Sequence, residues 1–331
     1  MKISVLGAGG WGTTLAILLH YNGHNVTLWD FKKSHAKELN KKRINSNYLP
    51  GIKIPKELTI SSDIDESSED KNLIVLAVPS QYLRNVVNQI NFHAIEDSIL
   101  VSVSKGIEKN TLMTMSHMLK DVFPNLDENQ IAVISGPSHA EEVSKRVPTA
   151  VVAASVNIET SKSIQAAFMT SYFRVYASTD ILGVELGGAF KNIIAIGAGI
   201  IDGAGFGDNT KAAIMTRGVT EISRLGLAMG ARPETFAGLS GMGDLIVTCM
   251  SRHSRNRYVG EQIGKGKKLK QILKSMEQVA EGVETTRSAK QLAEKINIET
   301  PITNEVYNIL YEDKDPIKAT TDLMTRDMKS E

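Results

Sequence analysis

Residues 2–12, KISVLGAGGWG, indicate the architecture of the amino-terminal half of this chain. The first five residues are a short apolar run that predicts a β-strand, and Gly7, Gly9 and Gly12 form a G-x-G-x-x-G pattern directly after it. In this context the first glycine permits a tight turn, the second lets a pyrophosphate approach the backbone, and the third lets a helix pack closely on the sheet. The free N–H groups at the helix start then face the phosphates. The alternative, a glycine-rich turn without a ligand, is disfavoured by this placement between strand and helix.

Short apolar runs alternate with helical patterns through the first half of the chain. The expected strands are Lys2–Leu6, Asn25–Trp29, Leu73–Val78, Ile99–Val103, Ile131–Ile134 and Ala150–Ala154. The expected helices are Trp11–Tyr21, Ser34–Lys42, Gln81–Gln89, Leu112–Asp121 and Glu159–Met169. Continuous apolar strands separated by helices are typical of a parallel sheet covered on both faces.

The strand-like runs stop near Asp180, and the rest of the chain has helical patterns. The expected helices are Leu182–Ile201, Asn209–Met229, Leu239–Met250, Arg257–Gly264, Thr285–Lys295 and Ile302–Tyr311. This change predicts an α/β protein in which a doubly wound parallel sheet is followed by an all-α domain. The dinucleotide-binding domain is expected at 1–180, and the substrate and catalytic domain at 181–331.

Composition narrows the function classes further. A chain of 331 residues is long enough for two domains, and its net charge of +1 gives no reason to expect nucleic acid or an anionic membrane as a partner. The single cysteine, Cys249, excludes an internal disulfide framework and fits a reducing compartment, so we expect a cytoplasmic protein. Residues 1–19 lack the continuous apolar core of a signal peptide. No histidine or cysteine spacing indicates a metal site.

Lys191 is a charged residue in an apolar segment, Leu182–Ile201, whose other polar residues are Glu185 and Asn192. These residues and five glycines predict a buried globular helix and not a membrane span. At helical spacing, Lys191 shares a stripe with Gly187, Gly188, Ala195 and Ala198. Such a stripe contacts a closely packed neighbour or forms the floor of a substrate pocket, and we expect the pocket.

Burial also bears on the chemistry of Lys191. A desolvated ammonium loses its proton more readily, which makes Lys191 a candidate general acid and base. The alternative is a structural lysine that extends to solvent or pairs with a buried carboxylate.

A candidate counter-charge for Lys191 is Asp244, which stands in the apolar run Leu239–Cys249 and shares a helical face with Thr248. Its alternative role is the N-cap of a structural helix. Just beyond, Ser254, Arg255 and Asn256 stand at the expected start of a helix, where arginine and backbone N–H groups suit a phosphate.

Three polar groups follow strands of the expected sheet. Lys105 and Ser138 come after two of these strands, so both could reach one pocket, although Lys105 alone could equally be a solvated loop lysine. Asp30 ends the second strand, 18 residues past Gly12, where an acidic residue holds a ribose 2′-hydroxyl and favours NAD. Lys32 and Lys33 follow at once and could meet a 2′-phosphate. The sequence leaves NADH and NADPH undecided.

With these residues assembled, the chain resembles the bacterial NAD(P)-dependent glycerol-3-phosphate dehydrogenases from residue 1 to about residue 310. The matching segments are GAGGWGTTLA at 7–16, SVSKGIE at 102–108, SGPSHAEEV at 135–143, ELGGAFKNIIAIGAGIIDG at 185–203, LSGMGDLIVTC at 239–249, SRN at 254–256 and EGVETT at 281–286. The resemblance implies a Rossmann domain followed by a helical domain. It also implies reversible reduction of dihydroxyacetone phosphate to sn-glycerol 3-phosphate, the phospholipid backbone, with NADPH or NADH.

The resemblance also implies roles for single residues. Lys191 is the implied proton donor and acceptor, and Lys105 and Asp244 complete the catalytic set. The implied substrate contacts are Lys105, Gly136, Ser138, Lys191, Asp244, Ser254, Arg255 and Asn256, with Arg255 and Asn256 on the phosphate. The implied dinucleotide contacts are Gly7, Gly9, Gly10, Trp11, Gly12, Phe31, Lys32, Lys105, Ala140, Arg255, Val279 and Glu281. Glycines in the central helix would permit a homodimer.

Three positions depart from the family pattern, and two alternative functions are compatible with part of the sequence. Gly10 stands where serine is common, Asp30-Phe31-Lys32 replaces a more basic stretch, and His139 replaces a phenylalanine. A β-hydroxyacid or 6-phosphogluconate-type dehydrogenase would share the two-domain layout and a catalytic lysine. An NAD(H)-sensing regulator would keep residues 7–12 but would have no need for Lys191, Asp244 and Arg255 together.

Overall fold

The computed structural model describes residues 1–328, and the chain divides into two compact units. The first unit consists of residues 1–105 and 113–185, and the second of residues 106–112 and 186 onward. The expected boundary at 180/181 lies just before this division, which falls inside helix α8 (Ile181–Gly203). One helix therefore begins in the first unit and continues as the core of the second.

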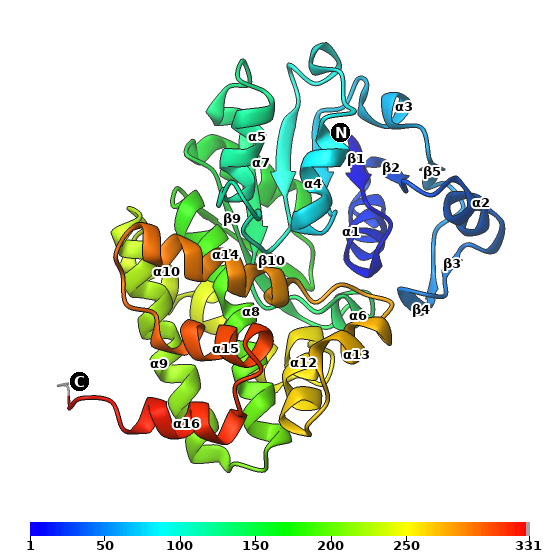
Figure 1. Cartoon of the computed structure of the whole chain (residues 1–331). Helices are drawn as coiled ribbons and strands as arrows, with labels where there is room; N and C mark the ends of the chain where they lie inside the picture. The colour runs from blue at the N-terminus through cyan, green and yellow to red at the C-terminus, as the bar shows by residue number, and fades with distance from the viewer. Residues whose placement is uncertain (329–331) are drawn as a thin grey trace. The chain divides into compact units, whose positions relative to one another are not determined.

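Within the described residues, the first unit is built on one eight-stranded sheet (Figure 1). In sheet order, its strands are β10 (Phe173–Ser178), β9 (Thr149–Ala154), β8 (Ile131–Ser135), β7 (Ile99–Ser102), β6 (Leu73–Leu76), β1 (Lys2–Leu6), β2 (Asn25–Trp29) and β5 (Thr59–Ser61). From β1 the chain moves first to β2 on one side and later to β6 on the other. The carboxyl ends of β1 and β6 therefore form a switch point, where ligands bind in open α/β sheets.

The sheet confirms a doubly wound, mainly parallel fold, but it is not parallel throughout. Strand β9 pairs antiparallel with β8 and parallel with β10, so the last two strands run against the others. Strand β10 was not expected because, at the sheet edge, it alternates buried and exposed residues and lacks the continuous apolar run of a strand buried on both faces. The short edge strand β5 and the hairpin of β3 (Ile44–Asn45) and β4 (Leu49–Lys53) were missed as well.

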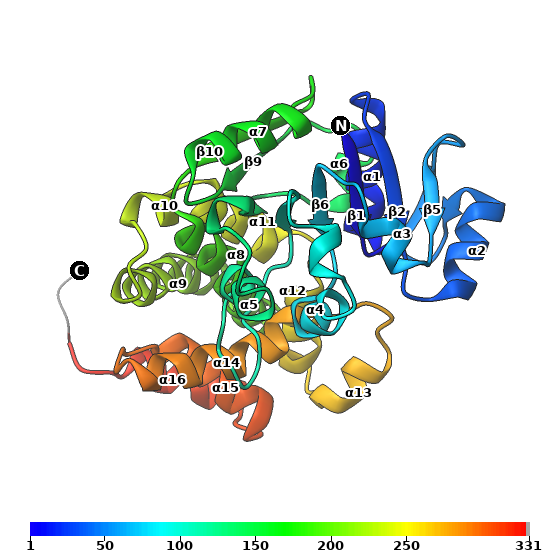
Figure 2. The same ribbon diagram turned by 90° about the horizontal axis from the view of Figure 1, so that it is seen from above.

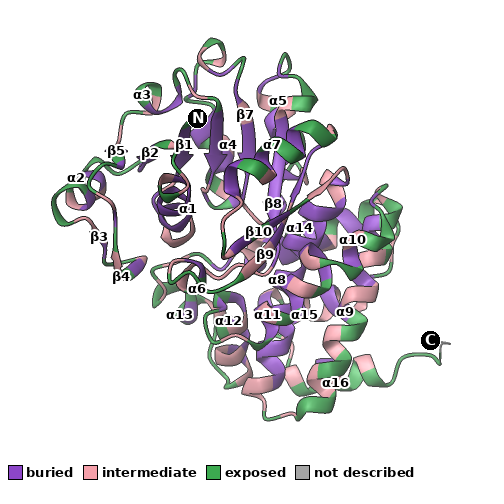
Figure 3. Ribbon diagram, turned by 180° about the vertical axis from the view of Figure 1, so that it is seen from behind, coloured by how far each residue is buried: buried purple, intermediate pink, exposed green. Residues whose placement is uncertain are grey.

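Helices cover both faces of this sheet. One apolar cluster joins the strands to α1 (Gly10–Tyr21) and α7 (Ile158–Phe168). The other joins them to α4 (Ser80–Val87) and α5 (Met115–Val122), which lie side by side (Figure 2). The central strands β7 and β8 are buried almost completely (Figure 3), as expected of a sheet covered on both faces. Three further α-helices of this unit are α2 (Lys33–Lys42), α3 (Ile64–Ser68) and α6 (Ala140–Val143).

The second unit is helical, as expected. Beyond α8 it consists of α9 (Asp208–Ala228), α10 (Pro233–Ala237), a π-helical turn η3 (Leu239–Gly243), α11 (Asp244–Met250), α12 (Arg255–Gly264), α13 (Leu269–Lys274), α14 (Glu281–Lys295), α15 (Pro301–Tyr311) and α16 (Pro316–Met324). The expected continuous helix at 239–250 is thus a π-helical turn followed by α11. Helices α10 and α13 were not predicted because segments of five or six residues are too short to show a clear helical period.

The glycines of α8 bring neighbouring helices of the same unit unusually close. A Cβ atom on Gly199 would lie 2.0 Å from the Arg257 carbonyl oxygen, and one on Gly203 would lie 2.2 Å from that of Glu261. Both carbonyls belong to α12. These glycines are therefore used inside one chain, and they give no argument for a second copy.

Helix α8 is the one helix among the described residues that is long and apolar enough to cross a membrane. Its most apolar window of 18 residues has a mean hydropathy of 1.5 and is 100% buried inside the protein. This burial is the behaviour of a core helix and agrees with the sequence interpretation.

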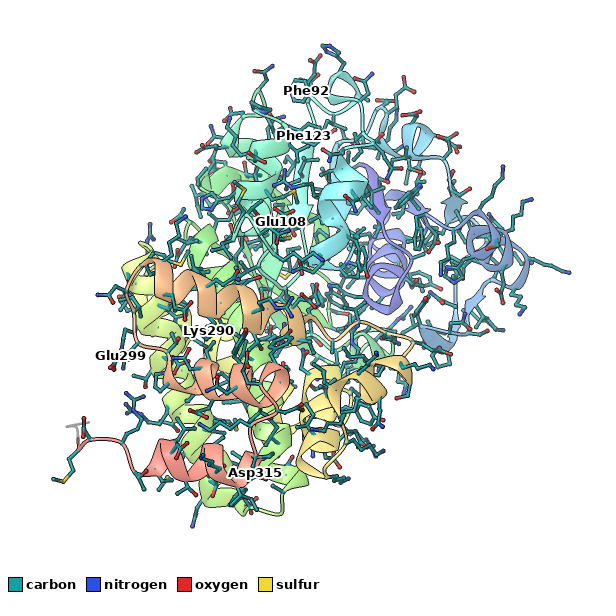
Figure 4. The ribbon with its side chains drawn as sticks, in the orientation of Figure 1. Phe92, Glu108, Phe123, Lys290, Glu299 and Asp315 are labelled. Carbon is teal, nitrogen blue, oxygen red and sulfur yellow. The ribbon has the colours of Figure 1, made fainter. Side chains whose placement is uncertain are left out.

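Buried or capping carboxylates fix the starts of two carboxyl-terminal helices. Asp315 accepts hydrogen bonds from the N–H groups of Ile317 at 3.0 Å and Lys318 at 2.9 Å, and so begins α16 (Figure 4). The buried carboxylate of Glu221, on α9, accepts hydrogen bonds from the N–H groups of Ile302 at 2.8 Å and Thr303 at 2.9 Å. Glu221 therefore joins α9 to the first turn of α15.

We predict that Glu221 makes stability depend on pH. Burial raises the pKa of this carboxyl above its ordinary value of 4.5, against hydrogen bonds from Thr303 and Ile302. Because the folded-state pKa is the higher one, the stabilisation is complete below about pH 4.5 and is lost as the pH rises through the folded-state pKa. As the pH rises, Glu221→Gln should therefore gain stability relative to the native chain. The gain in unfolding free energy should be about 1.4 kcal/mol for each unit by which the pKa of Glu221 differs between the folded and unfolded states.

Urea unfolding at a series of pH values measures this difference. Glu57→Gln, at an exposed glutamate, is the control and should show no such trend. A difference for Glu221→Gln that stays constant with pH would contradict the prediction.

Candidate functional site

The turn between β1 and α1 has the geometry of a dinucleotide cradle. Gly7 has a φ of +115°, and a Cβ there would lie 2.6 Å from the carbonyl oxygen of Ala77, directly after β6. A Cβ on Gly12 would lie 1.9 Å from the Gly7 carbonyl oxygen, so this glycine is needed for close packing. By contrast, a Cβ on Gly9 would meet no atom within 4 Å. The three glycines therefore serve the turn, the packing and an open approach to the backbone, which fits a bound pyrophosphate.

The β3–β4 hairpin, which was not predicted from the sequence, packs against this cradle and supports it. Fully buried Asn45 donates from Nδ2 to the carbonyl oxygen of Ala8 and to Thr13 Oγ1, both at 2.9 Å. A Cβ on Gly10 would lie 2.6 Å from the carbonyl oxygen of Tyr48 in the same hairpin. This contact gives a physical reason for glycine where serine is common in the family: a side chain there would displace the hairpin.

The other dinucleotide candidates of the first unit lie around the same turn. Ala140 begins α6, and its carbonyl oxygen accepts a bond from Thr14 Oγ1 of α1 at 3.4 Å. Trp11 packs against Phe173, with ring centroids 6.4 Å apart. Phe31 and Lys32 are exposed just beyond β2. The structure gives no reason for histidine at 139 in place of phenylalanine.

Lys105 and Ser138 meet on one carbonyl group, as their positions at strand ends predicted. Lys105 Nζ donates to the Gly136 carbonyl oxygen at 3.0 Å, and Ser138 Oγ donates to the same atom at 2.9 Å. Gly136 itself has a φ of +142°, in the region that favours glycine. These three candidates therefore form one polar cluster in the first unit.

Lys191 of α8 forms a buried ion pair with Asp244 of α11. Lys191 Nζ lies 2.6 Å from Asp244 Oδ1 and 2.7 Å from Thr248 Oγ1, and the two charged side chains are only 7% and 2% exposed. Thr248 Oγ1 also donates to the Asp244 carbonyl oxygen at 2.6 Å. The expected counter-charge is thus confirmed. The N-cap alternative for Asp244 is wrong, because Asp244 is the first residue of α11 and Gly243 is its N-cap.

The small-residue stripe beside Lys191 is closely packed and does not form the floor of an open pocket. A Cβ on Gly187 would lie 2.7 Å from the Ser240 carbonyl oxygen of the π-helical turn. Ala195 and Ala198 are fully buried. The expectation of a pocket floor is therefore wrong along this stripe, and its glycine lets α8 approach the segment that leads to Asp244.

The Ser254, Arg255 and Asn256 segment lies at a helix start, as predicted. Ser254 is the N-cap of α12 and accepts from the Arg257 N–H at 3.2 Å. Arg255 donates from Nη1 to the Val279 carbonyl oxygen at 2.9 Å, two residues before Glu281 begins α14. The predicted contacts at 255, 279 and 281 are thereby brought together in the second unit.

Asn256 is held by a network that the sequence did not reveal. It donates from Nδ2 to Asn192 Oδ1 at 2.8 Å, and its Oδ1 accepts from the Gly282 N–H at 2.9 Å. Asn192 directly follows Lys191 on α8. The bonds therefore connect the helix of Lys191 with the starts of α12 and α14.

Two further groups have strongly buried environments. Burial raises the pKa of the Cys249 thiol to about 12, partly offset by the charge of Lys191, so the thiol stays protonated and is a poor nucleophile. Burial also raises the pKa of Glu185, which accepts from the Ser116 N–H at 2.8 Å and from Ser116 Oγ at 2.5 Å. Glu185 thus ties the amino-terminal part of α8 to the start of α5, within the first unit.

Residues 1–328 contain no group of three or more histidine, cysteine, aspartate or glutamate side chains placed to hold a metal ion. The chemically useful groups of the second unit are instead a desolvated ammonium with its fixed carboxylate, and an arginine at a helix start.

A mainly parallel sheet with a glycine-rich cradle, followed by helices that bury a lysine and a carboxylate, defines a dinucleotide-dependent oxidoreductase. The family models for the NAD-dependent glycerol-3-phosphate dehydrogenase N-terminus and C-terminus match residues 2–161 and 180–321. The chain belongs to the NAD-dependent glycerol-3-phosphate dehydrogenase family.

Individual relatives support this assignment over the full length. The glycerol-3-phosphate dehydrogenase [NAD(P)+] of Chlorobium phaeobacteroides strain BS1 is 52% identical over 100% of this chain and 99% of its own length. That of Thermoanaerobacter sp. strain X514 is 51% identical with the same coverage. The crystal structure of the Coxiella burnetii glycerol-3-phosphate dehydrogenase shares 38% identity and a TM-score of 0.93, covering 98% of this chain and 99% of that one.

Proposed function

We propose that this chain reduces dihydroxyacetone phosphate reversibly to sn-glycerol 3-phosphate with NADH or NADPH. The observation that carries the proposal is the buried Lys191–Asp244 pair at 2.6 Å in a chain with a complete dinucleotide cradle. A charge pair of this kind costs desolvation energy, so a fold with no use for it would be as stable with apolar residues there. Supplying a phospholipid backbone in the cytoplasm is the cellular role that fits this reaction.

The residues of the first unit fit a dinucleotide. Gly9 leaves the backbone open for a pyrophosphate, while Gly7 and Gly12 allow the turn and the close packing beside it. The N–H groups at the start of α1 supply donors for the pyrophosphate. The further contacts that we propose are Gly10, Trp11, Phe31, Lys32, Lys105 and Ala140 from the first unit, and Arg255, Val279 and Glu281 from the second. When bound, the nicotinamide supplies the hydride for the ketone carbon.

Lys191 is the proposed general acid in the reducing direction. Its ammonium group donates a proton to the developing alkoxide of the substrate and takes it back in the reverse reaction. Asp244 and Thr248 hold Nζ in one place, because each lies within 2.7 Å of it. Asp244 also stabilises the charged form of the lysine before the proton is transferred.

Arg255 and Asn256 are the proposed phosphate ligands. The guanidinium of Arg255 is exposed at the start of α12, where backbone N–H groups add positive potential. Asn256 is held through Asn192 and Gly282, so its amide has a fixed orientation. Lys105, Gly136, Ser138 and Ser254 complete the proposed substrate contacts. Binding energy from a phosphate remote from the ketone helps to position the reacting carbon.

A substrate panel tests the proposal. The purified chain should oxidise reduced nicotinamide, followed by its absorbance, when dihydroxyacetone phosphate is added, and should be far less active with unphosphorylated dihydroxyacetone because the phosphate contacts are lost. The matched alternatives are 6-phosphogluconate and short β-hydroxy acids with the oxidised coenzyme. Turnover of one of these in place of dihydroxyacetone phosphate would replace the proposal, and dinucleotide binding without turnover of any of them would indicate a sensor.

A further inference from the structure

The carboxylate of Asp30, at the end of β2, already has partners within the first unit. Its Oδ1 accepts the N–H of Lys32 at 2.8 Å, and its Oδ2 lies 2.9 Å from His35 Nδ1. In a sheet of this kind the residue at this place faces the adenosine ribose, and a free acidic side chain there accepts the 2′-hydroxyl. Asp30 is instead only 5% exposed.

His35 is fixed in a position to hold Asp30. Since a carboxylate can only accept, His35 Nδ1 must donate the proton of this hydrogen bond. The imidazole is on the first turn of α2, is 11% exposed and packs edge-on against Tyr48, with ring centroids 5.5 Å apart. Tyr48 belongs to the hairpin that braces the glycine cradle. The hydrogen bond is therefore part of a packed structure and not a contact between mobile surface groups.

The groups that remain available beside Asp30 are cationic or aromatic. Phe31 is 70% exposed, and Lys32 Nζ lies 5.3 Å from the centre of its ring. Lys33 is exposed as well. A ribose at this strand end would thus meet exposed ammonium groups and a carboxylate whose two oxygens already accept hydrogen bonds from Lys32 and His35.

We propose that His35 is a coenzyme-specificity residue: by holding Asp30, it lets this site accept a ribose 2′-phosphate, so that the chain binds NADP(H) as well as NAD(H). The proposal rests on the dinucleotide site of the proposed function. Without His35, one oxygen of Asp30 would be released to accept a 2′-hydroxyl and to repel a 2′-phosphate, which carries up to about two negative charges.

Binding of the two oxidised coenzymes, measured by isothermal titration calorimetry without substrate, tests this role. In His35→Ala, the ratio of the Kd for NADP+ to the Kd for NAD+ should rise about tenfold over that of the native chain, because an unscreened carboxylate then faces the phosphate. Replacing that carboxylate in His35→Ala/Asp30→Asn should return the ratio to its native value. Adenosine 2′,5′-bisphosphate and 5′-AMP should show the same changes, since they differ in the 2′-phosphate alone.

His24→Ala is the matched control, because His24 stands before β2, at the opposite end of the strand, and bonds to the carbonyl oxygen of Ala167 at 3.0 Å. Its ratio should stay native. An unchanged ratio in His35→Ala, or a raised ratio that persists in the double variant, would overturn the role of His35. Failure of the native chain to bind either dinucleotide would instead overturn the proposed function itself, so the two failures can be told apart.

Discussion

Lys191→Ala is expected to lose turnover by about 10²–10⁴-fold while retaining its affinity for NADH, because a positioned general acid contributes rate enhancement of this size. The loss should appear in kcat, since the ammonium acts on charge that develops in the transition state. NADH binding, followed by fluorescence titration, should be nearly unchanged, because Lys191 is not among the proposed dinucleotide contacts and the glycine cradle lies in the other unit.

Lys211→Ala is the matched control for this experiment. Lys211 lies in the same unit and is also paired, 2.8 Å from Asp202, with 19% of its side chain exposed. Its removal should leave kcat within a few-fold of the native value, because we assign it no part in the site. Near-normal turnover of Lys191→Ala would remove the role assigned to Lys191.

Asp244→Leu is expected to lower the free energy of unfolding by about 3–5 kcal/mol, which is the usual cost of leaving a buried charge without its partner. The pair is almost wholly buried, so water cannot screen the remaining ammonium group. Thr248 Oγ1 still accepts a hydrogen bond from Lys191, but a hydroxyl does not neutralise the charge. Urea unfolding measures the loss.

The double variant Lys191→Met/Asp244→Leu separates the structural role from the catalytic one. Its unfolding free energy should return close to the native value, because apolar side chains of similar volume often replace a buried ion pair without loss. Its turnover should stay as low as that of Lys191→Ala. A double variant no more stable than Asp244→Leu would show that the cost arises from the shape of the site and not from the unpaired charge.

Much of the fold could be predicted because its signals are local. The glycines of 7–12 and the apolar runs that form β6 and β8 can be recognised without information from distant residues. Strand β10 and the antiparallel pairing of β9 could not be predicted in this way, since an edge strand is defined by its neighbour in the sheet. The π-helical turn at Leu239–Gly243 was hidden for a similar reason. Its glycine at 241 is required by a close approach to Phe236, where a Cβ would lie 2.2 Å from the carbonyl oxygen.

The contacts of the candidate site can be separated in the same way, into those with a local sequence signal and those without one. The pairing of Lys191 with Asp244 could be predicted because an isolated ammonium and an isolated carboxylate stand in two apolar segments. The bonds from Asn45 to the cradle and from Asn256 to Asn192 could not, because a polar residue in a mixed segment has many equally good partners. His35 and Asp30 are only five residues apart in the sequence, yet their hydrogen bond was not predicted. The position of Asp30 indicated a ribose ligand, and nothing in the sequence showed that its oxygens accept hydrogen bonds within the protein.

In the proposed mechanism, Lys191 protonates the substrate oxygen while the dinucleotide is bound by other residues. Its most direct test is a single-turnover experiment in which the Lys191→Ala chain, already saturated with NADH, is mixed rapidly with dihydroxyacetone phosphate. We expect NADH oxidation in this first turnover to be slower by about 10²–10⁴-fold than in the native chain, with the same amount of NADH bound at the start. A first turnover at the native rate would contradict the proposed role of Lys191.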